Sequence, residues 1–203
     1  MKTNLRLAIR GILFMLVLSG SAFAQTNSQP LKHKLETLHG TYSDQIAVDW
    51  GRGTYGKSVF TFNNGHWTLH FTLALDSLLK NPVFVFRTVG FYKVIEPNSS
   101  LPNTFNAIFY EDKKWVTLKT SDPKLAEAFG LSSCGLLPNI EKDISETGCS
   151  LWKPVKACNE DHDLLSLDSE GRLYFGLRPP DNDMCTPEKR PKTLYLPVIK
   201  QKN

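Results

Sequence analysis

The stretch that decides the fold is residues 57–74, KSVFTFNNGHWTLHFTLA. On either side of Asn63-Asn64-Gly65, large apolar residues occupy every second position, which is the period of a β-strand and not of a helix. Asn-Gly between two such runs supplies the positive φ angles that a tight two-residue turn requires. The stretch therefore predicts an antiparallel hairpin with one apolar face.

A second β-rich run, VFVFRTVGFYKVI, covers residues 83–95. Its even-numbered positions share one face and its odd-numbered positions share the other, and both faces are partly apolar. Gly90 in the middle of the run predicts a bulge or a bend of the strand. Shorter strands are expected at residues 46–50, 104–110, 115–120, 163–167, 172–176 and 194–199. Of these, the second and third are expected to form a hairpin around residues 111–114, and the fourth and fifth another around 168–171.

Two short segments have helical character. Residues 123–129 begin with Pro after the capping residue Asp122 and end at Gly130, as helices commonly do. Residues 31–38 form a short amphipathic piece after a polar lead-in at 25–34. Together these patterns predict a mainly β protein: an antiparallel, lipocalin-like barrel or half-barrel with one short helix and a disulfide-tied C-terminal section.

The N-terminal segment has the signature of a signal peptide. Lys2, Arg6 and Arg10 precede a short apolar core at residues 12–18, and Ala22-Phe23-Ala24 matches a cleavage site. The apolar core is too short to span a bilayer, and no later stretch is long enough. An uncleaved anchor is the alternative. We therefore expect a signal peptide at 1–24 and a periplasmic or secreted protein without a transmembrane segment.

The mature chain is expected to form a single β-barrel-like domain, residues 25–203. Its core strands would lie in 38–120, and 121–203 would hold the helix, the disulfide-bearing loops and the final strands. Without the three cations of the leader, 24 Lys and Arg become 21 against 20 Asp and Glu, a net charge of +1. So small a charge argues against nucleic acid as a partner.

All four cysteines, Cys134, Cys149, Cys158 and Cys185, lie in the C-terminal half. An even number in an exported chain predicts two disulfides. Three pairings are possible, and Cys134–Cys149 with Cys158–Cys185 is preferred because its closed loops do not cross. A zinc site is the alternative, but the spacings of 15, 9 and 27 residues lack the close Cys pairs of structural zinc sites.

The sequence gives only weak evidence for a catalytic or metal-binding site. His66 and His70 lie four residues apart on a predicted strand, about 13 Å, which is too far to share a metal ion. In Asp161-His162-Asp163, neighbouring side chains of an extended chain point apart, and no Gly-x-Ser-x-Gly motif supplies a nucleophile. We expect no enzyme activity, no catalytic residue, no metal and no cofactor. A hydrolase is the least favoured of three hypotheses.

The inward-facing aromatic residues are the better candidate for a functional site. A closed eight-stranded sheet has an interior that side chains fill or that holds one small ligand. The expected ligand-binding residues are Phe60, Phe62, Trp67, Leu69, Phe71, Phe84, Phe86, Tyr92, Phe105, Phe109 and Trp115. The small residues Thr88, Gly90 and Ala107 share this face and favour a pocket, with Arg87 or Lys93 as partners for an acidic headgroup. The alternative is that the aromatic residues form a filled core.

The order of these features resembles the adenomatosis polyposis coli down-regulated family, whose animal members are Wnt inhibitors. The residues that carry the resemblance are Gly40-Thr41-Tyr42-Ser43, then Phe60, Phe62 and Trp67, then DSLLKNP at 76–82 and Gly90-Phe91-Tyr92. The similarity covers about residues 38–120. Leu79 stands where the family has a cysteine, and no cysteine lies near Tyr42, so the family's disulfide is missing. For a bacterial-type member, the resemblance implies a barrel-like lipid-binding module and not Wnt antagonism.

The sequence thus predicts an exported protein that binds an apolar molecule, such as an acyl chain or lipid, inside a β-barrel. The second hypothesis is a protein-binding module, an inhibitor or envelope-assembly factor, with a filled barrel.

Overall fold

The computed structural model describes residues 22–202, and most of the expected signal peptide lies outside them. The strands are β1 (Gly40–Ser43), β2 (Val48–Gly51), β3 (Thr54–Asn63), β4 (His66–Ala74), β5 (Pro82–Pro97), β6 (Thr104–Tyr110), β7 (Lys113–Leu118), β8 (Glu141–Asp143), β9 (Glu160–Leu167), β10 (Leu173–Phe175) and β11 (Ile199–Lys200). The helices are α1 (Ala22–Glu36) and α2 (Pro123–Ala128), with short 3-10 turns η1 (Ser132–Cys134) and η2 (Pro187–Lys189).

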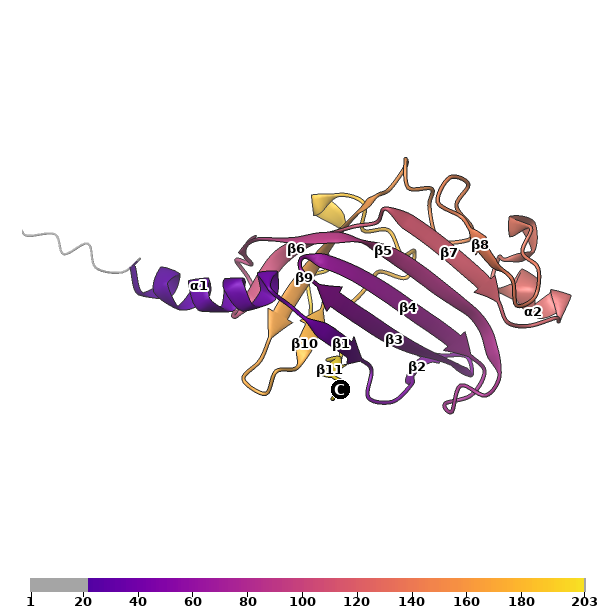
Figure 1. The fold of residues 1–203 in the computed structure, drawn as a ribbon, viewed down its shortest axis with the longest axis horizontal. Helices are drawn as coiled ribbons and strands as arrows, with labels where there is room; N and C mark the ends of the chain where they lie inside the picture. The colour runs from indigo at the N-terminus through magenta and orange to yellow at the C-terminus, as the bar shows by residue number, and fades with distance from the viewer. Residues whose placement is uncertain (1–21, 203) are drawn as a thin grey trace, which may run out of the picture.

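Eight of these strands form a nearly closed antiparallel barrel in the order β10-β9-β6-β5-β4-β3-β1-β11 (Figure 1). The two ends of this order meet where the segment before β11 runs beside β10. There Leu173 and Val198 exchange backbone hydrogen bonds of 3.0 and 2.8 Å, and the Tyr195 N–H donates to the Phe175 carbonyl. The expected fold class is confirmed, and the arrangement is compatible with a lipocalin-like fold.

The β3–β4 hairpin forms as the sequence predicts. Asn64 and Gly65 have φ angles of 50° and 79°, so both central turn residues adopt the left-handed conformation. Phe62 lies opposite Trp67, and the pairing continues without a break to Tyr55 opposite Ala74. The inner face of the hairpin is therefore mostly apolar, with Ser58 opposite Phe71 as a polar member.

Strand β5 is the longest of the described strands and changes its partner on one edge halfway along. Its first half pairs with β7 and its second half with β6, while β4 pairs with the other edge. The expected hairpin between residues 104–110 and 115–120 is therefore wrong, because β6 and β7 lie end to end along β5. The change occurs at Gly90, where an added Cβ would overlap the Tyr110 carbonyl oxygen. The glycine thus makes room for the chain that connects the two strands.

Two apolar clusters lie on the inner face of this sheet. The barrel cluster comprises the buried residues Leu35, Leu38, Tyr42, Phe62, Trp67, Tyr92, Val94, Phe105, Ala107, Phe109, Leu165, Leu173 and Val198. The annex cluster comprises Leu73, Val83, Phe84, Phe86, Val116, Leu118, Ala126, Leu131, Ile144 and Cys149. It lies where β4, β5 and β7 extend beyond the barrel and are covered by α2 and the segment that follows it (Figure 1).

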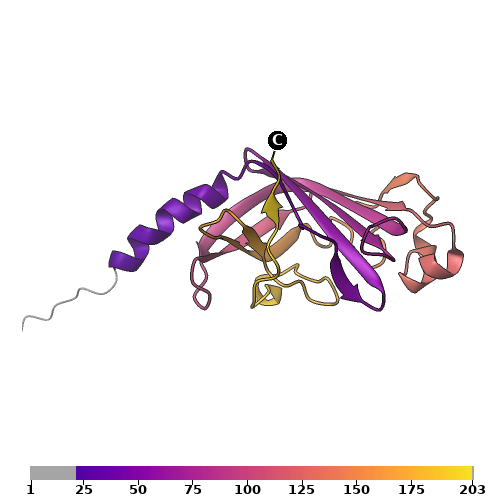
Figure 2. The same ribbon diagram turned by 90° about the horizontal axis from the view of Figure 1, so that it is seen from below.

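The helices frame the two clusters. Asp122 caps α2 by accepting hydrogen bonds from the backbone N–H groups of Lys124 and Leu125, as expected. Helix α1 is longer than the predicted piece at residues 31–38 and includes the predicted lead-in, and it projects from one end of the barrel (Figure 2). In residues 22–202, no helix has the length and apolar character needed to cross a bilayer.

Both disulfides join the expected partners. Cys134 is bonded to Cys149 and Cys158 to Cys185, so all four cysteines are used. The first bond holds the covering segment of the annex cluster. The second ties the segment just before β9 to residues 179–191, a Pro-rich excursion that contains η2.

Candidate functional site

The structure divides the predicted aromatic set between the two clusters. Seven of its eleven members belong to the barrel cluster or pack against it: Phe60, Phe62, Trp67, Leu69, Tyr92, Phe105 and Phe109. Phe71, Phe84 and Phe86 belong to the annex cluster or pack against it, and Leu69 contacts both clusters. Trp115 belongs to neither. The other ten predicted residues therefore form one apolar surface that is joined through Leu69, and the barrel encloses only part of it.

Aromatic rings from several strands meet inside the barrel. Trp67 and Phe109 pack edge to face with centroids 5.0 Å apart, and Phe62 and Tyr92 do so at 5.3 Å. Phe175 of β10, which was not in the predicted set, stacks on Phe60 at 4.2 Å. The sequence signal that could have identified Phe175 was its position in the strand expected at residues 172–176, directly before Gly176.

The polar atoms of these rings are satisfied by backbone. The Trp67 indole donates to the Tyr110 carbonyl oxygen at 3.0 Å, and the Tyr92 hydroxyl donates to the Leu35 carbonyl oxygen at 2.8 Å. Burial raises the pKa of Tyr92 to about 12. The hydroxyl therefore stays protonated and keeps its bond to α1 at neutral pH.

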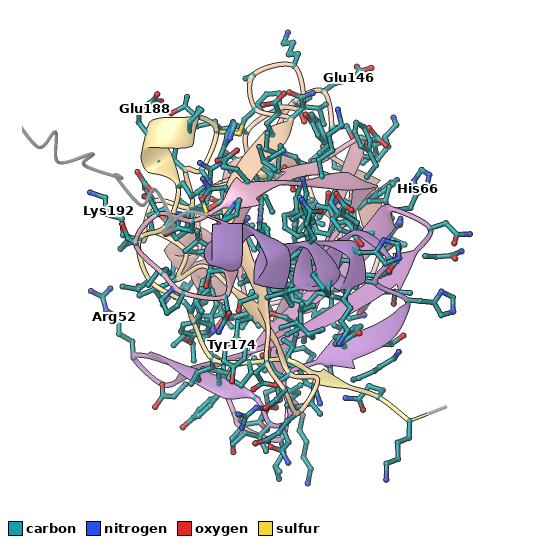
Figure 3. The ribbon with its side chains drawn as sticks, turned by 90° about the vertical axis from the view of Figure 1, so that its left-hand side faces the viewer. Arg52, His66, Glu146, Tyr174, Glu188 and Lys192 are labelled. Carbon is teal, nitrogen blue, oxygen red and sulfur yellow. A yellow bond between two sulfur atoms is a disulfide. The ribbon has the colours of Figure 1, made fainter. Side chains whose placement is uncertain are left out.

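Leucines of the N-terminal region close one end of the barrel. Leu35 and Leu38 are buried in the barrel cluster, and Leu31 packs against it. Viewed from this end, α1 lies in front of the centre of the barrel, whereas His66 points outward at its periphery (Figure 3). We call Leu31, Leu35 and Leu38 the leucine plug.

Thr88, Gly90 and Ala107 were expected to leave space for a pocket, but the space at Gly90 and Thr88 is occupied. The room beside Gly90 is taken by the Tyr110 carbonyl, and the buried Thr88 hydroxyl donates to the Lys113 carbonyl oxygen at 2.9 Å. Ala107 is buried in the barrel cluster. The barrel cluster is thus packed, and a ligand inside it would have to displace protein groups.

The annex cluster, in contrast, reaches the molecular surface. Trp50 is 54% exposed and lies over Gly56, with its ring 5.0 Å from that of Phe71. Phe71 contacts Phe84, which contacts Trp152 at 5.3 Å. We call Trp50, Phe71, Phe84 and Trp152 the open aromatic row. Because Leu69 touches both clusters, the row continues into the barrel cluster.

The proposed headgroup partners face away from both clusters. Arg87 lies 3.6 Å above the Trp115 ring and 2.7 Å from the Glu141 carboxylate, which raises the pKa of Arg87. Lys93 lies over the rings of Phe91 and Tyr110. Trp115 and these cations are on the outer face of the sheet, so they do not line the barrel.

Buried ionic groups lie near the start of β9 and do not form a catalytic triad. Asp161 pairs with Arg178, and the imidazole of His162 is 3.2 Å from Glu160. Asp163 accepts hydrogen bonds from the backbone N–H groups of Leu164 and Gly176, and burial raises its pKa to about 7. Each group has a structural partner of its own.

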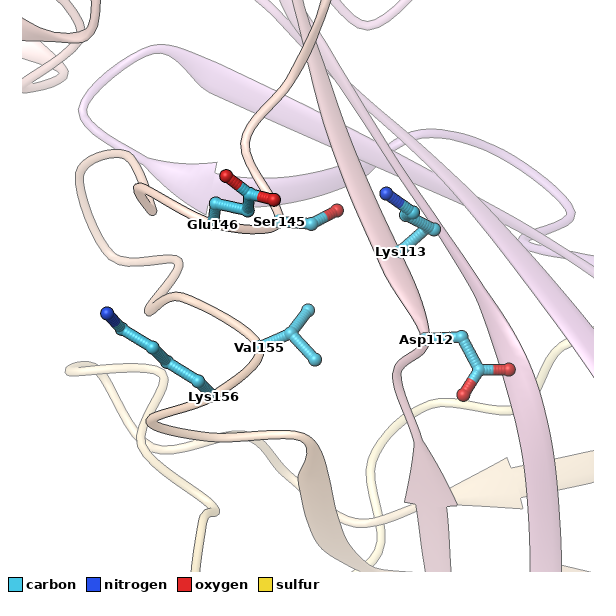
Figure 4. Close-up of a pocket in the computed structure, with 6 residues that line it drawn as sticks. All are labelled: Asp112, Lys113, Ser145, Glu146, Val155 and Lys156. Atoms are coloured by element: carbon cyan, nitrogen blue, oxygen red, sulfur yellow. The ribbon is translucent and has the colours of Figure 1, made fainter.

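Two pockets of the described chain lie outside the barrel. One, of about 400 Å³, is lined by Asp112, Lys113, Ser145, Glu146, Val155 and Lys156, and its charges of both signs do not suit an apolar ligand (Figure 4). The other, of about 570 Å³, lies beside the Cys134–Cys149 disulfide and Trp152. Among residues 22–202, no three His, Cys, Asp or Glu side chains converge as a metal site.

No protein-family model matches the chain, and no curated protein matches it either.

Proposed function

We propose that this chain is an exported binding protein, not an enzyme, for an apolar ligand such as an acyl chain. The observation that carries the proposal is the continuity of the apolar surface. It runs from the barrel cluster through Leu69 to the open aromatic row, where it meets solvent at Trp50. Ligand pockets are lined mainly by apolar and aromatic side chains. This surface is reached from solvent at Trp50, which is 54% exposed, whereas Phe84 farther along the row is buried.

The energetics suit a long, flexible apolar molecule. Burial contributes about 0.8 kcal/mol per methylene, and the costs of association consume part of this. An acyl chain therefore needs contact along much of its length, which a continuous track supplies. The two disulfides are consistent with the extracytoplasmic location that such an exported carrier requires.

The test is direct. Native mass spectrometry of the exported protein, followed by organic extraction, should recover an acyl lipid, and a fatty-acid panel should raise the melting temperature. Trp50→Ala should weaken the thermal shift. Trp115→Ala is the matched control, since that indole lies on the outer face with Arg87. No co-purified lipid together with no shift across the panel would refute the ligand.

A second candidate is a protein-binding module with a filled barrel. It is favoured by the packed barrel cluster and by exposed apolar side chains in two loops, since Ile46 before β2 is 75% exposed and Leu78 between β4 and β5 is 72% exposed. Trp50 would contact the acyl chain in the first candidate and the protein partner in the second, so it does not distinguish them. A protein partner that cross-links at residue 46 or 78 in a lipid-free preparation would favour this second candidate.

A further inference from the structure

The leucine plug differs from every other part of the barrel cluster in how it is held. The remaining members lie on barrel strands or, for Val198, on the segment that closes the seam, and backbone ladders fix them. Helix α1 pairs with no strand, and its N-terminal part projects away from the barrel (Figure 2). Leu31 and Leu35, which lie on α1, can therefore leave without breaking a hydrogen bond between strands, whereas Leu38 lies between α1 and β1.

Side-chain hydrogen bonds attach this end of α1 to β5. The Tyr92 hydroxyl donates to the Leu35 carbonyl oxygen at 2.8 Å and lies 3.2 Å from that of Glu36. The Lys32 ammonium donates to the Ile95 carbonyl oxygen at 2.8 Å. These acceptors include the last carbonyls of the helix, which have no partner within it. Tyr92 thus has two roles: its ring packs inside the barrel, and its hydroxyl holds α1 in place. We call this hydroxyl contact the latch.

We propose that the leucine plug is a displaceable gate, and that an acyl chain enters the barrel by taking the place of Leu31 and Leu35. This inference rests on the proposed function and assigns the entry route of the same site. The ligand must replace the apolar contacts that the leucines lose, so a methylene chain suits the vacated space and a polar ligand does not. The plug follows the expected cleavage site and stays on the mature chain.

The experiment measures association of cis-parinaric acid, whose fluorescence rises in apolar surroundings, by stopped flow. Tyr92→Phe keeps the ring and removes the latch, so association should be faster by about fivefold, the effect of one hydrogen bond. Tyr174→Phe is the matched control, since that hydroxyl donates to Asp168 on the β9–β10 hairpin and should leave the rate unchanged. Lys32→Met gives a second, independent release of α1.

Hydrogen exchange distinguishes a gate from a purely structural contact, because only a gate opens when the ligand binds. With the probe bound, the backbone amides of residues 31–38 should exchange faster, while those of β3 and β4 should not. Equal association rates in all variants, or unchanged exchange of α1, would overturn the gate and leave the proposed function standing. Absence of probe binding in every variant would end both.

Discussion

Gly90 is where a single side chain would disturb the fold most directly. We expect Gly90→Ala to cost about 3 kcal/mol or more, because the new methyl group meets the backbone of Tyr110, which cannot move without shifting β6 and β7. Gly56→Ala is the control. Its obstructing atoms are the side-chain ends of Trp50 and Phe71, so we expect about 1 kcal/mol. Urea denaturation of both variants measures the difference, and equal costs would contradict this account of β5.

Asp163 should make stability depend on pH. Its pKa is about 7 in the fold and 3.8 in the reference state, so the folded chain retains a proton that the unfolded chain loses. The contribution of this group is fully present below about pH 4 and is lost as pH rises through 7.

Asp163→Asn keeps the oxygen that accepts from Leu164 and Gly176 and cannot ionise. Relative to the native chain, we expect it to gain about 1–3 kcal/mol between pH 4.5 and pH 8, measured by urea denaturation at both values. The comparison cancels His162, whose pKa burial lowers. A difference that does not change with pH would contradict the assignment.

At the scale of elements, the second disulfide should protect the Pro-rich excursion. We expect the variant with Cys158→Ser and Cys185→Ser to be less stable by about 2–4 kcal/mol and to be cut by trypsin after Lys189 and Lys192. The excursion also depends on Asp183, which binds Lys153 and Lys189.

The matched control replaces Cys134 and Cys149 by Ser. Limited proteolysis with mass spectrometry should then locate the cuts in the segment over the annex cluster, at Lys124 or Lys142. Identical cleavage patterns in the two variants would show that the disulfides do not act on separate elements.

The elements that local rules determine were predictable. The β3–β4 turn needs Asn-Gly, α2 needs its Asp122 cap, and both are read from neighbouring residues. The placement of β6 and β7 was not predictable. A long strand can pair with two strands that lie end to end, and no local sequence feature distinguishes this arrangement from a hairpin. The expectation that Trp115 lines the barrel was also wrong, because its pairing with Arg87 puts it on the outer face.

At the scale of the whole molecule, the sequence predicted the apolar face but not its division. Period-two alternation identifies which residues share a face, and the inner residues of β4 and β5 are indeed apolar and mostly buried. How far the barrel encloses that face depends on contacts between distant segments, such as Val198 with Leu173. The leucine plug could not be predicted for the same reason. Amphipathic spacing shows which side of a helix is apolar, but not which surface that side packs against.

The two halves of this face are tied together at Lys114, opposite Thr88 on β5 and near the point where β5 changes partners. Its ammonium lies 2.5 Å from the Glu111 carboxylate, and the two side chains are only 3% and 7% exposed. It also donates to the carbonyl oxygens of Lys153 and Cys158, which fixes the segment leading into β9. A buried pair of this kind is costly to break from one side because the remaining charge stays unpaired.

We therefore expect Lys114→Met to cost about 3–5 kcal/mol in urea denaturation. Lys113→Met should cost less than about 1 kcal/mol, because the Lys113–Asp143 pair is half exposed. Adding Glu111→Gln to Lys114→Met should restore part of the loss, since no buried charge then remains. Because β5 runs through both clusters, each variant should still unfold in one transition. Equal costs for the two lysine variants, or separate transitions, would mean that the barrel and the annex are independent units.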